Sequence, residues 1–292
     1  MNLSTPSTNE TRNYQVDMES NRRLTDTWTC DRARLAIYQF LSLATVNPQA
    51  ERWQRILDPD FQELASAAVK VIQDDAQACP DRLAPGELPL TSLDLAPLLT
   101  FLRRPRDELI EEFNQVFGLL ISRECPPYET EYCPQTFSVY RAQHLADIAG
   151  FYRAFGLQPS SRSPERQDHI SLELEFMAWL NAKTLYAFEQ SDKDNENLCR
   201  DAQVRFFGEH LAWWTTAFAL AVRKKADGIK DERELNSPPG SLQGALGAFL
   251  AAFVPAERGI LGISPPTALT SVTEDHEEGC EACPLSAGTN FE

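Results

Sequence analysis

Apolar residues recur at helical spacing along most of this 292-residue chain. From Thr29 onward they fall three or four positions apart, which is the period of an amphipathic helix. No segment alternates apolar and polar residues between hairpin turns, as a half-buried strand would. Stretches rich in proline and glycine, such as residues 79–91, separate the periodic segments. The pattern predicts an all-α fold, a single globular domain of roughly nine to ten helices over residues 28–256.

Both ends of the chain depart from this pattern. Residues 1–27 are polar, and residues 257–292 are rich in proline, glycine and acidic side chains. Such compositions bury too little apolar surface to order a chain, so two disordered tails are expected. Between them, the longest expected helices cover residues 135–155, 163–188, 194–225 and 242–254, the second of them capped by Ser163 with Pro164 at its first position.

The formal net charge of the chain is −16, and its pI is about 4.7. Nucleic acid is disfavoured as a partner, because binding of phosphates requires clustered Lys and Arg. An acidic surface speeds the encounter with basic or amphipathic segments, although the same charge also keeps a protein soluble without any partner. No stretch reaches the roughly 18 apolar residues that span a membrane, and charged residues interrupt the segment after Arg22-Arg23-Leu24. We expect a cytoplasmic protein without a membrane span.

The chain has seven cysteines, an odd number that favours reduced thiols over a disulfide framework. Two of them belong to the pattern His276-x3-Cys280-x2-Cys283, which suits zinc or an iron–sulfur cluster. No fourth ligand lies nearby in the sequence, although Cys125 and Cys133 could approach in the fold. The tail is therefore either a metal site or a redox-labile or inert segment. A metal- or redox-linked regulatory or assembly protein acting through these cysteines is an alternative function.

Two polar clusters stand at predicted joints between helices. A pair of prolines precedes Tyr128 and Glu129 and fixes the direction of these side chains. Glu165 lies in the first turn of a later expected helix, ahead of Asp168 and His169. This last pair either caps the structure, binds a positive group of a ligand, or forms a catalytic pair. Catalysis is disfavoured, because adjacent helical residues point about 100° apart and no nucleophile motif is present.

Two further features lie in the expected helices. Glu173 and Glu175 sit among apolar residues, so internal ion pairs with arginines are expected. An aromatic segment belongs either to the core or to a groove for an apolar peptide helix. The residues of this segment include Phe206, Phe207, Trp213 and Trp214.

Three motifs resemble those of the TorD/DmsD/NarJ family of molybdoenzyme-specific maturation chaperones. They are Phe113-Asn114-Gln115-Val116-Phe117-Gly118, Pro127-Tyr128-Glu129, and Asp168-His169 followed by Leu172-Glu173-Leu174-Glu175-Phe176-Met177. They occur in the family's order, and the helical pattern extends the likeness to most of residues 28–256. The sequence departs from the family in both tails and at Arg166-Gln167, where a proline often precedes the Asp-His pair.

The resemblance implies an all-helical, cytoplasmic chaperone rather than an enzyme. Such a chaperone binds the N-terminal, often twin-arginine, segment of the apo catalytic subunit of a dimethyl-sulfoxide-reductase-type enzyme and assists insertion of the molybdenum cofactor. It requires no cofactor of its own and is a monomer or a domain-swapped dimer. Some family members are reported to bind guanine nucleotides, but no nucleotide-binding motif is present here. The two polar clusters would form two edges of one recognition surface, in which Asp168 faces a signal-peptide arginine and the partner-binding residues are Tyr128, Glu129, Glu165, Asp168 and His169.

Overall fold

A computed structural model describes residues 27–80, 82–118, 122–133, 138–158, 160, 165–228 and 237–271. Within these residues the all-α prediction is confirmed: nine α-helices are present, and the only β-type pairing is an isolated bridge between Tyr128 and His169. The α-helices are residues 27–44, α2 (Pro59–Asp74), α3 (Ala96–Phe101), α4 (Arg106–Phe117), α5 (Ser138–Ala154), α6 (Ile170–Glu189), α7 (Lys193–Phe206), α8 (Ala212–Asp227) and α9 (Leu242–Leu261).

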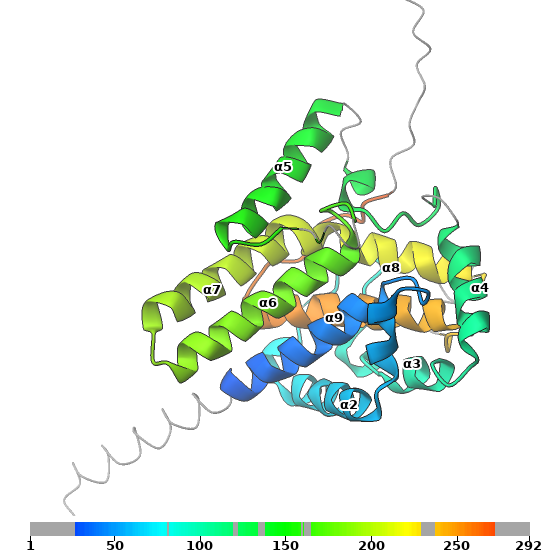
Figure 1. Ribbon diagram of the computed structural model, residues 1–292, viewed down its shortest axis with the longest axis horizontal. Coiled ribbons are helices and arrows are strands. Elements are labelled where there is room, and N and C mark those ends of the chain that lie inside the picture. Colours follow the sequence, from blue (N-terminus) through cyan, green and yellow to red (C-terminus); the bar gives the residue numbers. More distant parts are fainter. Residues whose placement is uncertain are drawn as a thin grey trace, which may run out of the picture.

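Helix α9 lies at the centre of the bundle, with α8 alongside it (Figure 1). Gly247 allows this close approach, because a Cβ atom at that position would lie 2.7 Å from the carbonyl oxygen of Ala219 on α8. The helix is long and apolar enough to cross a membrane, with a mean hydropathy of 1.3. In this fold, however, 78 % of that stretch is buried inside the protein, so it serves as a core helix.

Helix α9 extends to Leu261, beyond the expected end at Val254, and Pro255 lies inside it. A proline within a helix leaves the carbonyl four residues earlier without its usual N–H donor. Here that carbonyl belongs to Ala251, and it accepts a hydrogen bond of 2.9 Å from the backbone N–H of Leu88. A neighbouring loop thus satisfies the carbonyl, and the helix continues through the proline.

Two buried ion pairs join the end of α9 to other elements. Arg34, on the helix over residues 27–44, donates from Nε to Glu257 Oε2 at 2.9 Å. Arg258 Nη2 donates to Glu87 Oε2 at 2.9 Å. All four side chains are buried, so each charge is compensated by a partner of opposite sign.

The central helices differ from the sequence prediction at two points. Helix α6 begins at Ile170 with His169 as its N-cap, whereas Ser163 and Pro164 lie outside the described residues. The helix expected over residues 194–225 is divided into α7 and α8 by a π-helical turn, η5 (Phe207–Leu211). A π-turn adds a residue to the local repeat and so redirects the side chains around it.

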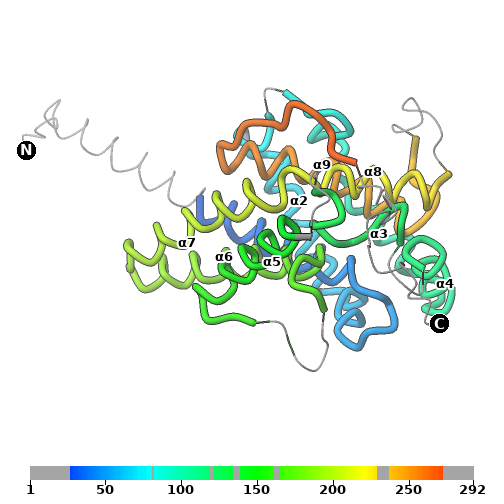
Figure 2. The backbone as a smooth tube through the Cα atoms, turned by 90° about the horizontal axis from the view of Figure 1, so that it is seen from above, coloured from blue at the N-terminus to red at the C-terminus, as the bar shows by residue number. Residues whose placement is uncertain are grey.

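Helix α5 occupies an outer position on the bundle, next to the paired helices α6 and α7 (Figure 1 and Figure 2). Its buried residues include Ile148 and Tyr152, which belong to the core. Near its start, Val139 and Tyr140 are exposed large apolar side chains. One part of α5 therefore anchors it to the body, while the beginning of the helix stands away from the core.

Candidate functional site

The isolated β-bridge brings the two polar clusters of the sequence together. The backbone N–H of Glu129 donates to the carbonyl of Asp168 at 2.9 Å, and the N–H of Ile170 donates to the carbonyl of Pro127, also at 2.9 Å. Glu129 begins the short 3-10 helix η4 (Glu129–Tyr132), and Ile170 begins α6. The prediction that these clusters lie together is therefore correct, although most of their side chains point inward.

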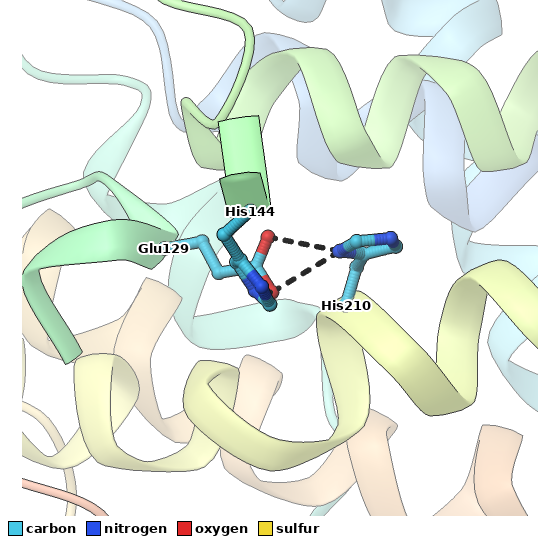
Figure 3. Close-up of side chains that lie close together, drawn as sticks. All are labelled: Glu129, His144 and His210. Atoms are coloured by element: carbon cyan, nitrogen blue, oxygen red, sulfur yellow. Dashed lines mark hydrogen bonds and ion pairs between the residues drawn. The ribbon is translucent and has the colours of Figure 1, made fainter. Parts of the chain in front are cut away.

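Glu129, expected to bind a partner, is fully buried and does not face solvent. Its Oε1 accepts a hydrogen bond from Trp213 Nε1 at 2.9 Å and lies 2.8 Å from His144 Nε2. Its Oε2 lies 3.2 Å from His210 Nδ1. Figure 3 shows Glu129, His144 and His210 converging from η4, α5 and the π-turn. The carboxylate thus joins three separate elements without any guanidinium.

Glu173 lies beside this cluster, on the first turn of α6. Its Oε2 accepts a hydrogen bond of 3.2 Å from Trp214 Nε1, so the expected ion pair with an arginine is not formed. Burial, followed by the charge of Glu129, raises the pKa of Glu173 well above its usual value. Both effects favour the protonated form of Glu173. Glu175 does pair with Arg52, at 2.9 Å, but this pair lies at the surface, because the Glu175 side chain is 57 % exposed.

Asp168 is buried and is already paired within the chain. Its Oδ2 accepts hydrogen bonds from Thr130 Oγ1 at 2.7 Å and Arg166 Nη2 at 2.8 Å. The Arg166 guanidinium also lies 4.2 Å from the centre of the Tyr128 ring. Arg166 therefore occupies the place that the sequence interpretation gave to a partner's arginine. Asp168 is available to an external arginine only if Arg166 moves away.

His169 supports the capping interpretation. Its Nδ1 accepts a hydrogen bond of 3.1 Å from the backbone N–H of Ser171, as an N-cap acceptor does. Burial lowers the pKa of His169 to about 4, so the ring is neutral at pH 7. The ring packs edge-on against Tyr128 at 5.2 Å. Asp168 and His169 thus hold the bridge and the start of α6.

Tyr128 and Glu165 are the two expected binding residues that reach solvent. The Tyr128 hydroxyl donates to Glu165 Oε1 at 3.0 Å. Burial, followed by the charge of Glu165, raises the pKa of Tyr128 to about 12. Glu165 lies at a cleft of about 630 Å³ between α5 and residues 165–167, which Tyr152 and Arg153 also line.

A second cleft, of about 820 Å³, lies on another side of α5 and next to Glu129. Trp213 lines this cleft, whereas Phe206, Phe207 and Trp214 are buried in the core. The aromatic segment therefore belongs mainly to the core, with one indole at the cleft. The residues around the opening are Cys133, Tyr140, Gln143, His144, Ala146, Asp147 and Trp213.

Sequence analysis missed the three side chains that contact the Glu129 carboxylate. His144, His210 and Trp213 lie 15, 81 and 84 residues away from it in the chain, and only the fold joins them. The scarcity of histidine, with four in the whole chain, was the one available signal. The predicted metal ligands His276, Cys280 and Cys283 lie outside the described residues.

Comparisons with known proteins agree with the motif analysis. Residues 89–220 match the family of nitrate reductase delta subunits. The chain is 28 % identical over 130 residues to a perchlorate reductase assembly chaperone protein of Dechloromonas aromatica (strain RCB), covering 41 % of this chain and 55 % of the relative. It is 34 % identical over 92 residues to a selenate reductase assembly chaperone protein of Thauera selenatis, covering 28 % of this chain and 47 % of the relative.

These matches span about half the length of each curated relative. The family match includes all three sequence motifs, the β-bridge, and the cluster around Glu129. An all-α fold, the ordered motifs and the assembly chaperones among the relatives agree with one another. The matched part of the chain, residues 89–220, is therefore similar to the TorD/DmsD/NarJ family, and the curated relatives that it matches are reductase assembly chaperones.

Proposed function

We propose that this protein is a cytoplasmic, system-specific chaperone for the catalytic subunit of a dimethyl-sulfoxide-reductase-type molybdoenzyme. It binds the N-terminal, twin-arginine segment of the apo subunit and keeps that subunit open until the molybdenum cofactor is inserted. The observation that carries the proposal is the match to two assembly chaperones of reductases. The chaperone contributes binding and timing, and the redox chemistry belongs to its partner.

The two clefts beside α5 supply a surface of the right chemistry for such a segment. Asp147, at the cleft near Glu129, has a side chain that is 61 % exposed, and Glu165 lies at the other cleft. Carboxylates bind guanidinium groups with charge-assisted hydrogen bonds. The exposed Val139 and Tyr140 offer apolar contact to the hydrophobic part of a leader sequence. The overall charge of −16 favours encounter with a basic segment.

The five expected partner-binding residues divide into two groups in this proposal. Tyr128 and Glu165 contact the partner, because their side chains reach the surface. Glu129, Asp168 and His169 act indirectly, since they are buried and hold η4 against the start of α6. Their loss would disturb the clefts by moving α5 or the bridge.

Fluorescence anisotropy tests the proposal. The probe is a labelled peptide carrying the twin-arginine leader of a dimethyl-sulfoxide-reductase-type catalytic subunit, measured with EDTA present. We expect Asp147→Asn and Glu165→Gln each to weaken binding by about three- to tenfold, as loss of one charge-assisted contact does. Glu189→Gln, at the exposed end of α6, is the matched control and should bind as the unmodified protein does.

A peptide in which both arginines are replaced by lysines should bind more weakly, because lysine lacks the planar fork of donors. Equal binding of the arginine, lysine and scrambled peptides would contradict the proposal. Equal effects of Asp147→Asn and Glu189→Gln would refute the placement of the segment beside α5.

A further inference from the structure

Two imidazoles and one carboxylate converge at the junction of η4, α5 and the π-turn. One ligand atom from each of Glu129, His144 and His210 lies within 4.8 Å of the other two. Ligands of a tetrahedral zinc ion, bound at about 2.1 Å, lie about 3.4 Å from one another. The Glu129 oxygens lie 2.8 Å from His144 Nε2 and 3.2 Å from His210 Nδ1. Small side-chain movements would therefore place a metal ion between them.

The hydrogen bonds of His210 point to a cation at this place. His210 is fully buried, and its Nε2 has no hydrogen-bond partner among the described residues. That atom lies 3.7 Å from Asp147 Oδ2, while Nδ1 faces Glu129. A neutral imidazole carries one proton, so one of its nitrogens would direct a lone pair at a carboxylate. A metal ion at Nδ1 removes this conflict, because Nε2 then carries the proton and donates toward Asp147.

This arrangement also has the outer features of metal centres. A metal-bound histidine commonly donates its second N–H to a carboxylate, which is the position of Asp147. Trp213 Nε1 donates to Glu129 Oε1 and orients that carboxylate. His144, with a side chain that is 28 % exposed, connects the cluster with the adjoining cleft and provides an entry path. The π-turn that carries His210 is a local irregularity of a kind that is frequent at functional sites.

We propose that Glu129, His144 and His210 form a binding site for a divalent transition metal ion of the zinc type, with Asp147 as the outer partner of His210 and a position open to the cleft. Two neutral imidazoles and a carboxylate are a donor set that suits such ions. The ion would tie α5 to η4 and to the π-turn that precedes α8. It would thereby fix the helix that separates the two clefts.

Zinc itself is the probe for the test. Because the C-terminal His276-x3-Cys280-x2-Cys283 pattern offers a second set of ligands, all measurements use the full chain with Cys280→Ser and Cys283→Ser. After treatment with a chelator, bound zinc is counted by elemental analysis and its affinity is measured by calorimetry. We expect one zinc ion per chain and a higher Tm in the presence of zinc.

Substitutions then locate the ion. His144→Ala is the decisive variant, because this partly exposed residue can be replaced without opening the core. It should lower zinc affinity by at least about tenfold, and Asp147→Asn should lower it by about tenfold, as outer partners do. Glu189→Gln, at the exposed end of α6, lies outside the ligand set, so zinc affinity should be unchanged.

Cobalt(II) provides a second readout, because absorption bands of bound cobalt report the ligand set directly. The bands should be present in the tail-substituted chain and absent in His144→Ala. Failure to retain zinc in the tail-substituted chain, or equal affinity in His144→Ala, would overturn the proposal. In that event a hydrogen bond, rather than a metal ion, would join His210 to Glu129. Peptide binding in EDTA is independent of this result, so the proposed function stands or falls separately.

Discussion

Buried carboxylates at two places in this fold are neutralised in different ways. At the end of α9, Glu257 is bound by Arg34, and Glu87 is bound by Arg258. Beside α5, Glu129 is bound by two imidazoles and an indole. Guanidinium groups are permanently charged, whereas imidazoles can gain or lose a proton or bind a metal.

The chemistry of the partner groups therefore distinguishes a region held by permanent charges from a region whose contacts can change. The α9 pairs depend on guanidinium groups, which stay charged at any physiological pH. The cluster at Glu129 adjoins a cleft of about 820 Å³. It contains two imidazoles, which can gain or lose a proton or bind a metal. The α9 pairs therefore serve stability, and the binding that we propose takes place beside α5.

The largest expected effect comes from breaking an α9 pair. Arg258→Met leaves Glu87 buried without its guanidinium and should lower the free energy of unfolding by about 3–5 kcal/mol. Urea denaturation measures this change. The double variant Arg258→Met/Glu87→Gln removes the stranded charge and should recover part of the loss. A loss below about 1 kcal/mol in the single variant would contradict the structural role of this pair.

The second-largest loss of stability is expected for Glu129→Gln, in the cluster beside α5. An amide has one acceptor oxygen in place of two, so its NH₂ group must face either His210 or the pair of His144 and Trp213. We expect a loss of about 2–3 kcal/mol in the free energy of unfolding, together with loss of zinc binding. Unfolding and calorimetry on the same sample measure both. Normal zinc affinity in this variant would show that Glu129 is not a ligand of the metal ion.

Low pH should destabilise the folded protein at the start of α6, because the buried ring of His169 becomes protonated. The pKa of this buried ring is about 4 in the folded protein and about 6.5 when unfolded, so the unfolded state binds more protons between these values. Its contribution to stability is present above pH 6.5 and is lost as the pH falls toward 4. From pH 7 to pH 5 the loss should be about 2 kcal/mol. His169→Asn cannot titrate, and an equally large loss in that variant would refute this assignment.

The smallest effect is expected at Glu173, the carboxyl group beside Glu129. Its pKa is raised well above the usual value by burial and by the charge of Glu129, which favours the protonated form, and glutamine imitates that form in shape. Glu173→Gln should change the free energy of unfolding at pH 7 by less than about 1 kcal/mol, and in the stabilising direction. A loss as large as that of Glu129→Gln would mean that Glu173 carries a charge.

The sequence predicted the fold class, because the 3.6-residue period of buried positions is a local property. It failed at Pro255, where the continuation of α9 depends on a hydrogen bond from Leu88, remote in the chain. It also missed the π-turn, because nothing in the residues around His210 distinguishes that turn from an ordinary helix. Local patterns thus predict helices but not their irregularities.

The candidate site was predicted only in part, for the same reason. Tyr128, Glu129, Asp168 and His169 were recognised because they stand at breaks in the helical pattern, and the β-bridge joins them. Their burial could not be predicted, because it depends on Arg166 and on distant helices. His144 and His210 were missed because each lies inside a helix and gains its role only through Glu129.

The most direct test of the central claim uses the whole partner. The chain is mixed with the apo catalytic subunit of the molybdoenzyme, and the mass of the complex is measured by light scattering during size-exclusion chromatography. The proposal predicts a complex with equal numbers of both proteins, and weaker or no binding when the subunit lacks its twin-arginine segment or already contains the molybdenum cofactor. Equal binding to the intact apo, truncated and cofactor-loaded subunits, or binding to none of them, would contradict it.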